Sequence, residues 1–223
     1  MIDFFHRQIQ LWGEDTQKLL QTKKIAIVGA GGLGSSLAFA LGASGISEIH
    51  IMDFDEVSHH NIHRQIAFKI GDEGKNKAVI NSKVMQQRCP FVKAIAYECD
   101  FKEWCKKEVE VDLIIDATDN LEVRADINSY AKDKNLPWIY GSVEAFHGQV
   151  CFIDKSSFTD MFKITKHKLD GIATPIVMHI ASLQANLALR YLAGLKVKKD
   201  FLYYLFFNDE GELVTQKFGL PTN

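Results

Sequence analysis

Short apolar runs alternate with helical stretches along most of the chain, and several of the runs are rich in β-branched residues. Apolar runs of this length are typical of strands buried on both faces of a sheet. We therefore predict strands at residues 25–28, 48–52, 92–97, 111–117, 137–143 and 147–153. Helices are predicted at residues 14–21, 35–44, 77–88, 101–107, 121–134 and 175–195. This alternation favours an α/β fold with a doubly wound, mainly parallel, Rossmann-like sheet.

Three segments fall outside the alternation. Residues 1–22 carry large apolar side chains, so we expect them to dock on this domain or on a second copy of it. Residues 154–173 lack periodicity and are predicted to form a crossover loop. Residues 201–218 are rich in aromatic side chains and are expected to form a hairpin that extends the sheet in antiparallel fashion. We expect one domain over residues 1–223.

A glycine-rich turn separates the first buried strand from the helix that follows it. Residues 29–34 read G-A-G-G-L-G and contain the pattern G-x-G-x-x-G. In such a turn Gly29 would allow a tight bend, Gly31 would let the backbone approach a phosphate, and Gly34 would let the helix pack closely on the strand. The helix N-terminus favours an anion, and Asp53, at the end of the next strand, can accept hydrogen bonds from ribose hydroxyls. The arrangement predicts a nucleotide site; the alternative is a turn without a ligand.

Further polar residues follow the predicted strand ends. Asn61, Arg64 and Lys77 come after the strand that ends at Asp53. Arginine and lysine at this edge of an open α/β sheet could hold a polyphosphate. Asp119 follows another strand, and we expect it to cap the next helix, to bind a metal ion, or to do both.

Composition excludes several other classes of protein. The 223 residues are 47% hydrophobic with a net charge of −2, so we do not expect nucleic acid as a partner. No apolar run reaches the length of about 18 residues that spans a membrane, and no signal peptide is evident, so a cytoplasmic location is expected. The cluster of His59, His60 and His63 lacks the spacing of a metal site. The four cysteines form no C-x-x-C pair and are expected to be small buried hydrophobes.

Several motifs in combination carry a family resemblance. They are R-Q-I-Q-L-W-G, V-G-A-G-G-L-G, D-F-D-E-V with N-I-H-R-Q beyond it, G-K-N-K-A, D-A-T-D-N and G-I-A-T-P-I-V-M-H-I-A-S-L-Q-A. Together they resemble the ThiF/MoeB/HesA-type adenylyltransferases, the family that includes the activating enzymes of ubiquitin-like proteins. The resemblance covers roughly residues 4–194.

The resemblance implies ATP, rather than NAD, as the nucleotide. It implies that ATP is bound by Gly29, Gly31, Gly32, Gly34, Asp53, Asp55, Asn61, Arg64 and Lys77. It assigns catalytic roles to Arg7, Arg64, Lys77 and Asp119, with Asp119 binding Mg²⁺. Arg7 resembles an arginine that family members insert into the site of a partner subunit, which implies a homodimer.

The implied reaction is attack by a carboxylate on the α-phosphorus of ATP, which forms an acyl-adenylate and releases pyrophosphate. A carboxylate is already nucleophilic, so the site needs positioning and charge neutralisation rather than a base. The expected substrate is a small ubiquitin-fold sulfur-carrier protein that ends in Gly-Gly, of the thiamine or molybdopterin type. Alternatives are a peptide, amino acid or tRNA carboxylate, a non-catalytic carrier-binding partner, and a nicotinamide-dependent oxidoreductase.

The sequence departs from the family pattern in two places. Many relatives hold a structural zinc with two C-x-x-C pairs, but residues 152–223 contain no cysteine, so no zinc is expected. A downstream cysteine nucleophile is missing for the same reason, and we expect activation without transfer to the enzyme. Where relatives commonly show S-N-L-x-R-Q, this chain has S-H-H-N-I-H-R-Q, and no role is assigned to His60.

Overall fold

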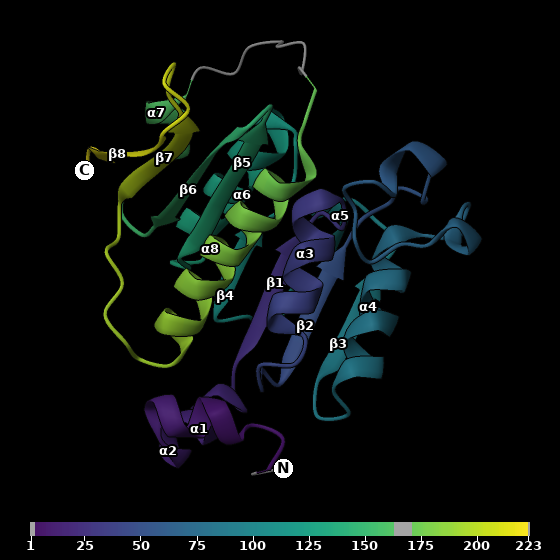
Figure 1. Ribbon diagram of the computed structural model, residues 1–223. Helices are drawn as coiled ribbons and strands as arrows, with labels where there is room; N and C mark the ends of the chain where they lie inside the picture. The colour runs from purple at the N-terminus through teal and green to yellow at the C-terminus, as the bar shows by residue number, and fades with distance from the viewer. Residues whose placement is uncertain (1–2, 163–170, 223) are drawn as a thin grey trace.

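A mixed β-sheet forms the middle layer of the molecule in the computed structural model, which describes residues 3–162 and 171–222 (Figure 1). In these residues the sheet has eight strands in the order β3-β2-β1-β4-β5-β6-β7-β8. The strands are β1 (Lys24–Val28), β2 (Glu48–Met52), β3 (Lys93–Tyr97), β4 (Leu113–Asp116), β5 (Trp138–Glu144), β6 (His147–Ile153), β7 (Phe201–Phe207) and β8 (Leu213–Gly219). The first five are parallel and the last three are antiparallel, which confirms the predicted fold class.

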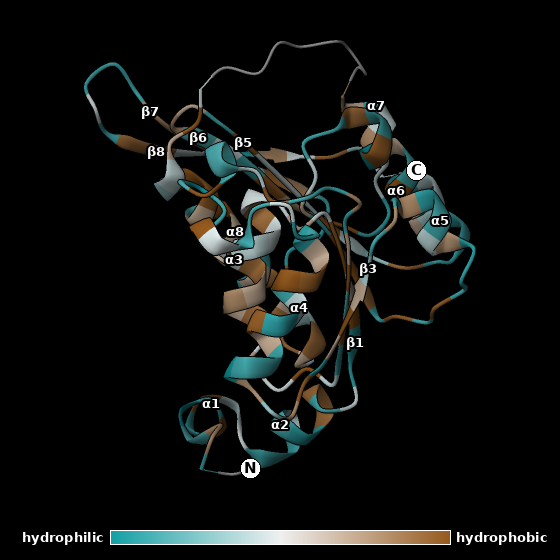
Figure 2. Ribbon diagram, turned by 90° about the vertical axis from the view of Figure 1, so that its right-hand side faces the viewer, coloured by the Kyte–Doolittle hydropathy of each residue, from teal (hydrophilic) through white to brown (hydrophobic). Residues whose placement is uncertain are grey.

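Helices cover both faces of this sheet. They are α1 (His6–Trp12), α2 (Glu14–Leu20), α3 (Gly32–Leu41), α4 (Lys77–Arg88), α5 (Phe101–Cys105), α6 (Leu121–Asp133), α7 (Phe158–Met161) and α8 (Thr174–Leu192). Figure 2 shows α3, α4 and α8 on one side of the strands and α5, α6 and α7 on the other. Helices α1 and α2 lie apart from both layers, at the end of the sheet where β1 begins. No helix in the described part of the chain is long and apolar enough to cross a membrane.

Each face of the sheet is buried in its own hydrophobic core. Ile25 and Ile27 of β1 lie in the core beneath α3, α4 and α8, whereas Ala26 and Val28 lie in the core beneath α5, α6 and α7. Successive side chains of a strand point to opposite faces, so a strand covered on both sides is apolar at nearly every position. Full burial of an isoleucine stabilises the fold by about 1.5–3 kcal/mol. This burial explains the continuous apolar runs in the sequence.

The predicted helices and strands are all present, with shifted ends. The largest shift is at α3, which begins at Gly32 rather than at residue 35, because Gly31 is its N-cap and accepts the first backbone hydrogen bond from Ser35. Helix α1 was not predicted, nor was α7 within the expected crossover loop. Two 3₁₀ turns, His59–Asn61 and Ile70–Asp72, lie between β2 and α4. Residues 163–170 of the crossover loop lie outside the described residues.

A buried carboxylate ties the segment after β6 to the start of β7. Asp200 Oδ1 accepts hydrogen bonds from the backbone N–H groups of Asp154, Lys155 and Ser156, at 3.0–3.1 Å. Asp200 has a positive φ of 58°, and its carbonyl oxygen accepts a bond from Leu220 N–H. Burial alone would raise the pKa of Asp200, but the three backbone donors outweigh it and lower the pKa below its ordinary value of 3.8. The ionised form is therefore the stabilising one.

We predict that Asp200→Asn lowers the free energy of unfolding by about 2 kcal/mol at pH 7, because it removes the charge that accepts these bonds. Asparagine tolerates a positive φ, so the backbone itself is not penalised. The lowered pKa means that the stabilisation is present at neutral pH and is lost as the pH falls below about 4. Urea unfolding at pH 7 and pH 3 measures the difference between variant and wild type, which should shrink at the lower pH.

Asp154→Asn is the matched control, because the Asp154 side chain makes only a partly exposed pair with Lys199 at 3.2 Å. Such pairs contribute less than about 1 kcal/mol. An Asp200→Asn loss that is equally large at pH 3 would show that the charge of Asp200 is not the cause.

Candidate active site

The candidate site is a cleft of about 390 Å³ at the carboxyl ends of the parallel strands. The chain passes from β1 outward to β2 and β3, then returns to β4 on the other side of β1. The loops after β1 and β4 therefore diverge, and in open α/β sheets ligands bind at such a switch point. The cleft gathers eight of the predicted residues. They are Gly29, Gly31, Gly32, Asp53, Asp55, Arg64, Lys77 and Asp119.

The glycine turn forms the floor of the cleft. Gly29 has a φ of 96°, and a Cβ there would lie 2.7 Å from the carbonyl oxygen of Ala117. Gly34 does not line the cleft: it lies inside α3, and a Cβ on it would overlap the carbonyl oxygen of Gly29. By contrast, a Cβ on Gly31 would meet no atom closer than 3.5 Å. The bare face of Gly31 is therefore left open toward the cleft, where a ligand can approach the backbone.

Asp53 links the ends of the first two strands. Its Oδ2 accepts a hydrogen bond from Ala30 N–H at 2.7 Å, and its Oδ1 accepts one from Asp55 N–H at 2.8 Å. Burial raises the pKa of Asp53 above its ordinary value, and the two backbone donors oppose the rise. Each carboxylate oxygen can accept a second hydrogen bond. Asp53 thus holds the glycine turn and still presents acceptors to the cleft.

Lys77, the first residue of α4, forms an ion pair with Asp55 at 2.9 Å. The Lys77 side chain is only 9% exposed, whereas that of Asp55 is 52% exposed. Asn76 holds this arrangement, because its Nδ2 donates to the carbonyl oxygens of Asp53 and Asp55 while its Oδ1 caps α4. The lysine is therefore fixed at the cleft, and its counter-ion, the carboxylate of Asp55, is exposed to solvent.

Arg64 reaches the cleft from the loop that follows the first 3₁₀ turn. Its Nη1 lies 2.9 Å from His63 Nε2 and donates to the carbonyl oxygen of His60 at 3.3 Å. Asn61 is buried and does not line the cleft; its Oδ1 accepts a hydrogen bond from Ser58 N–H and closes the turn. The structure therefore brings Arg64, but not Asn61, to the site that the sequence predicted for both.

A buried ion pair supports the loop after β4. Arg124 of α6 donates to Asp116 Oδ2 at 3.0 Å and to the carbonyl oxygens of Thr118 and Gly141. Burial alone would lower the pKa of Arg124, but Asp116 and, more weakly, Asp119 raise it. Sequence reasoning missed Arg124, although its spacing from Ile127 puts a charge on the apolar side of the predicted helix.

Asp119 occupies the loop that this pair supports. The expectation that Asp119 caps the next helix is wrong, because Asn120 is the N-cap and accepts a hydrogen bond from Val123 N–H. The carboxylate of Asp119 makes no hydrogen bond or ion pair with another residue of the described chain, and it lines the cleft. It is therefore available to a ligand or a cation.

The half of the cleft near β5 is mainly apolar. Val143, Glu144, Ile172 and Val177 line it. Ile172 forms a parallel bridge with Ala145 in the β5–β6 turn, and Thr174 Oγ1 donates to the carbonyl oxygen of His63 at 2.7 Å. Residues 172–174, where α8 begins, are thereby attached both to the β5–β6 turn and to the loop that carries Arg64. None of these four residues was predicted, because they are ordinary apolar and acidic positions in the sequence.

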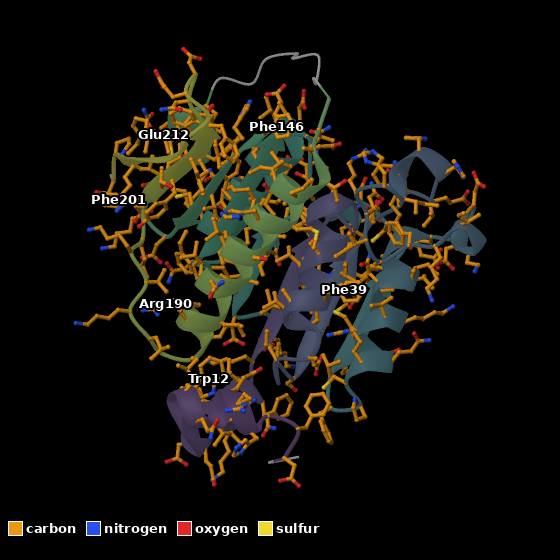
Figure 3. The ribbon with its side chains drawn as sticks, viewed as in Figure 1. Trp12, Phe39, Phe146, Arg190, Phe201 and Glu212 are labelled. Carbon is orange, nitrogen blue, oxygen red and sulfur yellow. The ribbon has the colours of Figure 1, made fainter. Side chains whose placement is uncertain are left out.

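Arg7 lies far from this cleft. It belongs to α1, where its Nη1 donates to Gln10, and α1 is anchored by a bond from Gln8 to the carbonyl oxygen of Ser44, between α3 and β2. Figure 3 shows Trp12 of the same helix at one end of the molecule and Phe146, in the turn beside the cleft, at the other. Arg7 does not reach the site of its own chain.

The sheet order, the glycine turn and the acid at the end of β2 define a Rossmann-like nucleotide-binding fold. The chain belongs to the ThiF family, whose family model matches residues 5–219. This membership confirms the resemblance predicted from the sequence motifs.

Similar proteins include a sulfur carrier protein adenylyltransferase of Thermus thermophilus, 33% identical over 67% of this chain and 56% of that protein. A molybdopterin-synthase adenylyltransferase of Haemophilus influenzae is 27% identical over 98% of this chain and 95% of its own length. The chain spans about half the length of the first curated relatives that it matches. Among solved structures, E. coli MccB with a MccA derivative has a TM-score of 0.84 at 19% identity, over 97% of this chain and 72% of that one, which shows the shared fold.

We predict that Arg124→Met lowers the free energy of unfolding by about 3–5 kcal/mol at pH 7, because it leaves the Asp116 carboxylate buried and unpaired. Burial raises the pKa of Asp116, and without Arg124 a larger rise is expected. Protonation then favours the folded variant, so its deficit relative to wild type should shrink as the pH is lowered from 7 to 5.

Chemical denaturation across this pH range measures the effect. Lys102→Met is the control, because Lys102 pairs with Asp126 on the surface at 3.3 Å. That control should change stability by less than about 1 kcal/mol at every pH. A pH-independent deficit for Arg124→Met would contradict the role assigned to the Asp116 charge.

Proposed function

We propose that the chain uses ATP to adenylate the C-terminal carboxylate of a small ubiquitin-fold sulfur-carrier protein, of the thiamine or molybdopterin type, and releases pyrophosphate. One observation carries the proposal: Arg64, Lys77 and the unpartnered Asp119 meet the glycine turn in a single cleft. Two cations beside an anion-binding helix end suit a polyphosphate. The names of the relatives, a sulfur carrier protein adenylyltransferase and a molybdopterin-synthase adenylyltransferase, support the same substrate class.

The nucleotide half of the site follows from α3 and Asp53. The first N–H groups of a helix have no partners within it, so those following Gly31 at the start of α3 are available to phosphate oxygens. The spare acceptor positions of Asp53 suit the ribose hydroxyls. The cleft also has apolar side chains against which the adenine ring can pack. They are Met52, Phe101 and Val123.

The chemistry requires two anions to approach each other. The carrier carboxylate must reach the α-phosphorus while charge accumulates on the departing pyrophosphate. Arg64 and Lys77 neutralise that charge. Lys77 already points into the cleft because Asp55 holds it, and a phosphate can take the place of this exposed counter-ion. No general base is needed, because the carboxylate is ionised at neutral pH.

The carboxylate of Asp119, together with the phosphates of ATP, also fits Mg²⁺. This ion is usually held by one or two carboxylates together with substrate phosphates. The described residues contain no cluster of three or more metal-binding side chains, but Asp119 offers a carboxylate without another partner. When bound there, Mg²⁺ would neutralise phosphate charge. No zinc is expected.

The cysteines support activation without a covalent enzyme intermediate. Burial raises the pKa of Cys105 to about 11 and that of Cys151 to about 12, so neither is a thiolate at neutral pH. Cys89 is buried, and burial also raises the pKa of Cys99. The adenylate is then consumed by a nucleophile from outside these residues.

An aromatic strip beside the cleft suits a folded acceptor rather than a free amino acid. Glu144, which lines the cleft, pairs across the β5–β6 hairpin with His147. The His147 ring lies 5.7 Å from that of Tyr204, which stacks on Phe206 at 5.0 Å. These side chains share one face of the sheet, and aromatic residues are enriched at protein interfaces. A carrier seated there would have its tail close to Glu144.

The test is ATP–pyrophosphate exchange with purified small β-grasp carriers that end in Gly-Gly. Exchange should depend on one carrier and disappear when its two terminal glycines are removed. We predict that Arg64→Ala and Asp119→Ala each lower the exchange rate by about a hundredfold or more, because charge stabilisation in the transition state is lost. Asp209→Ala, in the exposed β7–β8 turn, is the control and should retain full activity. Exchange without any carrier, or tight nicotinamide binding without ATP binding, would contradict the proposal.

We also propose a homodimer in which Arg7 completes the site of the partner subunit. In this arrangement Arg7→Ala and Asp119→Ala are each inactive alone, but their mixed dimer has one intact site. Random exchange of equal amounts makes half of the dimers mixed, so about a quarter of the wild-type activity should return. Carrier-dependent exchange after verified subunit mixing measures the recovery.

The matched control mixes Arg64→Ala with Asp119→Ala. Both residues line the cleft of the same chain, so every site in that mixture lacks one of them and no activity should return. Recovery in the control, or none in the Arg7 mixture, would argue against the proposed arrangement.

A further inference from the structure

Gln65 is a buried polar residue of the cleft that no part of the proposed reaction uses so far. It directly follows Arg64 and lines the cleft, and only 4% of its surface is exposed. Its Oε1 is buried without a hydrogen-bond partner in the described chain. An unpartnered buried carbonyl destabilises a folded protein, so the presence of a glutamine here calls for a reason other than stability.

The amide nitrogen of Gln65 faces the glycine turn. A Cβ built on Gly31 would lie 3.5 Å from Gln65 Nε2, which is the nearest atom to that position. Gly31 is the N-cap of the ten-residue helix α3, so this open position lies at the helix end that favours an anion. A ligand oxygen near the missing side chain of Gly31 would be within reach of the amide N–H group.

The backbone holds Gln65 in this position. Its N–H donates to the carbonyl oxygen of Asn61 at 3.0 Å, and its carbonyl oxygen accepts from Phe68 N–H at 3.1 Å. Burial and these bonds restrict the side chain, so the amide is in place before a ligand arrives. Such preorganisation is what a binding residue requires.

Gln184 provides an internal comparison. It is also fully buried with an unpartnered Oε1, but its Nε2 donates to the carbonyl oxygen of Asp116 at 2.6 Å. The amide of Gln184 therefore has a structural bond at the end of β4. The amide nitrogen of Gln65 makes no hydrogen bond to another described residue, and its donor capacity is left for a ligand.

We propose that Gln65 is a phosphate-binding residue, whose Nε2 donates a hydrogen bond to an oxygen of the nucleotide phosphate seated at the start of α3. A phosphate oxygen can only accept, which matches the amide nitrogen and not the carbonyl oxygen. This inference rests on the proposed nucleotide function and adds a neutral donor beside the cations Arg64 and Lys77.

The test compares ligands with and without phosphate. Isothermal titration calorimetry measures the Kd of ATP, AMP and adenosine for the wild type, Gln65→Met and Gln65→Glu. We expect Gln65→Met to weaken ATP and AMP binding by about ten- to a hundredfold, since a hydrogen bond to a charged group is lost. Adenosine should bind within about twofold of wild type, because it has no phosphate. Gln65→Glu keeps the side-chain shape and should weaken ATP further, because its carboxylate repels phosphate.

Thermal stability gives a second readout. Gln65→Met removes the unpartnered carbonyl, so its Tm should equal or exceed that of the wild type while ATP affinity falls. Gln184→Met removes a real bond as well, so its Tm should fall. A merely structural role of Gln65 predicts that adenosine and ATP affinity fall together with Tm. That outcome, or unchanged ATP affinity in either Gln65 variant, would overturn the proposal.

The two proposals fail in different ways. If the wild type binds ATP but shows no carrier-dependent pyrophosphate exchange, the proposed carrier reaction is wrong. The titrations then still decide whether Gln65 binds phosphate. If the wild type supports exchange and either Gln65 variant binds ATP as tightly as the wild type, only the assignment of Gln65 is wrong.

Discussion

The ion pair between Asp116 and Arg124 is the constraint on which the site depends. It joins the last residue of β4 to α6, and through the carbonyl oxygen of Gly141 it also reaches β5. The same guanidinium holds Thr118, two residues beyond β4. A buried pair of this kind contributes little net stability relative to an apolar replacement, because desolvation offsets the attraction. Its contribution is geometric: it determines where the loop that carries Asp119 leaves the sheet, and hence how the cleft opens between β1 and β4.

Much of the fold could be predicted because a strand that is buried on both faces appears in the sequence as a continuous apolar run. The strand predicted at residues 25–28 matches β1 to within one residue, and the helix predicted at residues 77–88 matches α4. Helices α1 and α7 were missed because each is too short to show a period and neither has a side-chain N-cap. Helices α2 and α5 are also short, but α2 begins with the acids Glu14 and Asp15, and Asp100 caps α5. The glycine turn was located as a motif, but its helix begins within it, because Gly31 itself serves as the cap.

The site was harder to predict than the fold. Local spacing identified Asp53, Lys77 and Asp119, which follow strand ends or begin a helix. It could not tell which of two adjacent polar residues caps α6, and Asn120 proved to be the cap. Nor could it show that Asn61 turns inward to close a 3₁₀ turn, because that depends on a bond to Ser58 rather than on sequence spacing. Arg124 was missed because its importance depends on Asp116, a partner on another element.

The carboxylate of Asp200 has a consequence for the conditions that the chain can withstand. It joins the segment after β6 to β7 in a chain whose residues 152–223 contain no cysteine. Thiolate ligands are lost to oxidants, and a zinc ion is lost to chelators. A carboxylate that accepts backbone hydrogen bonds is sensitive to neither. The connection that Asp200 makes therefore resists oxidants and chelators, but it is lost in strong acid, where the carboxylate is protonated.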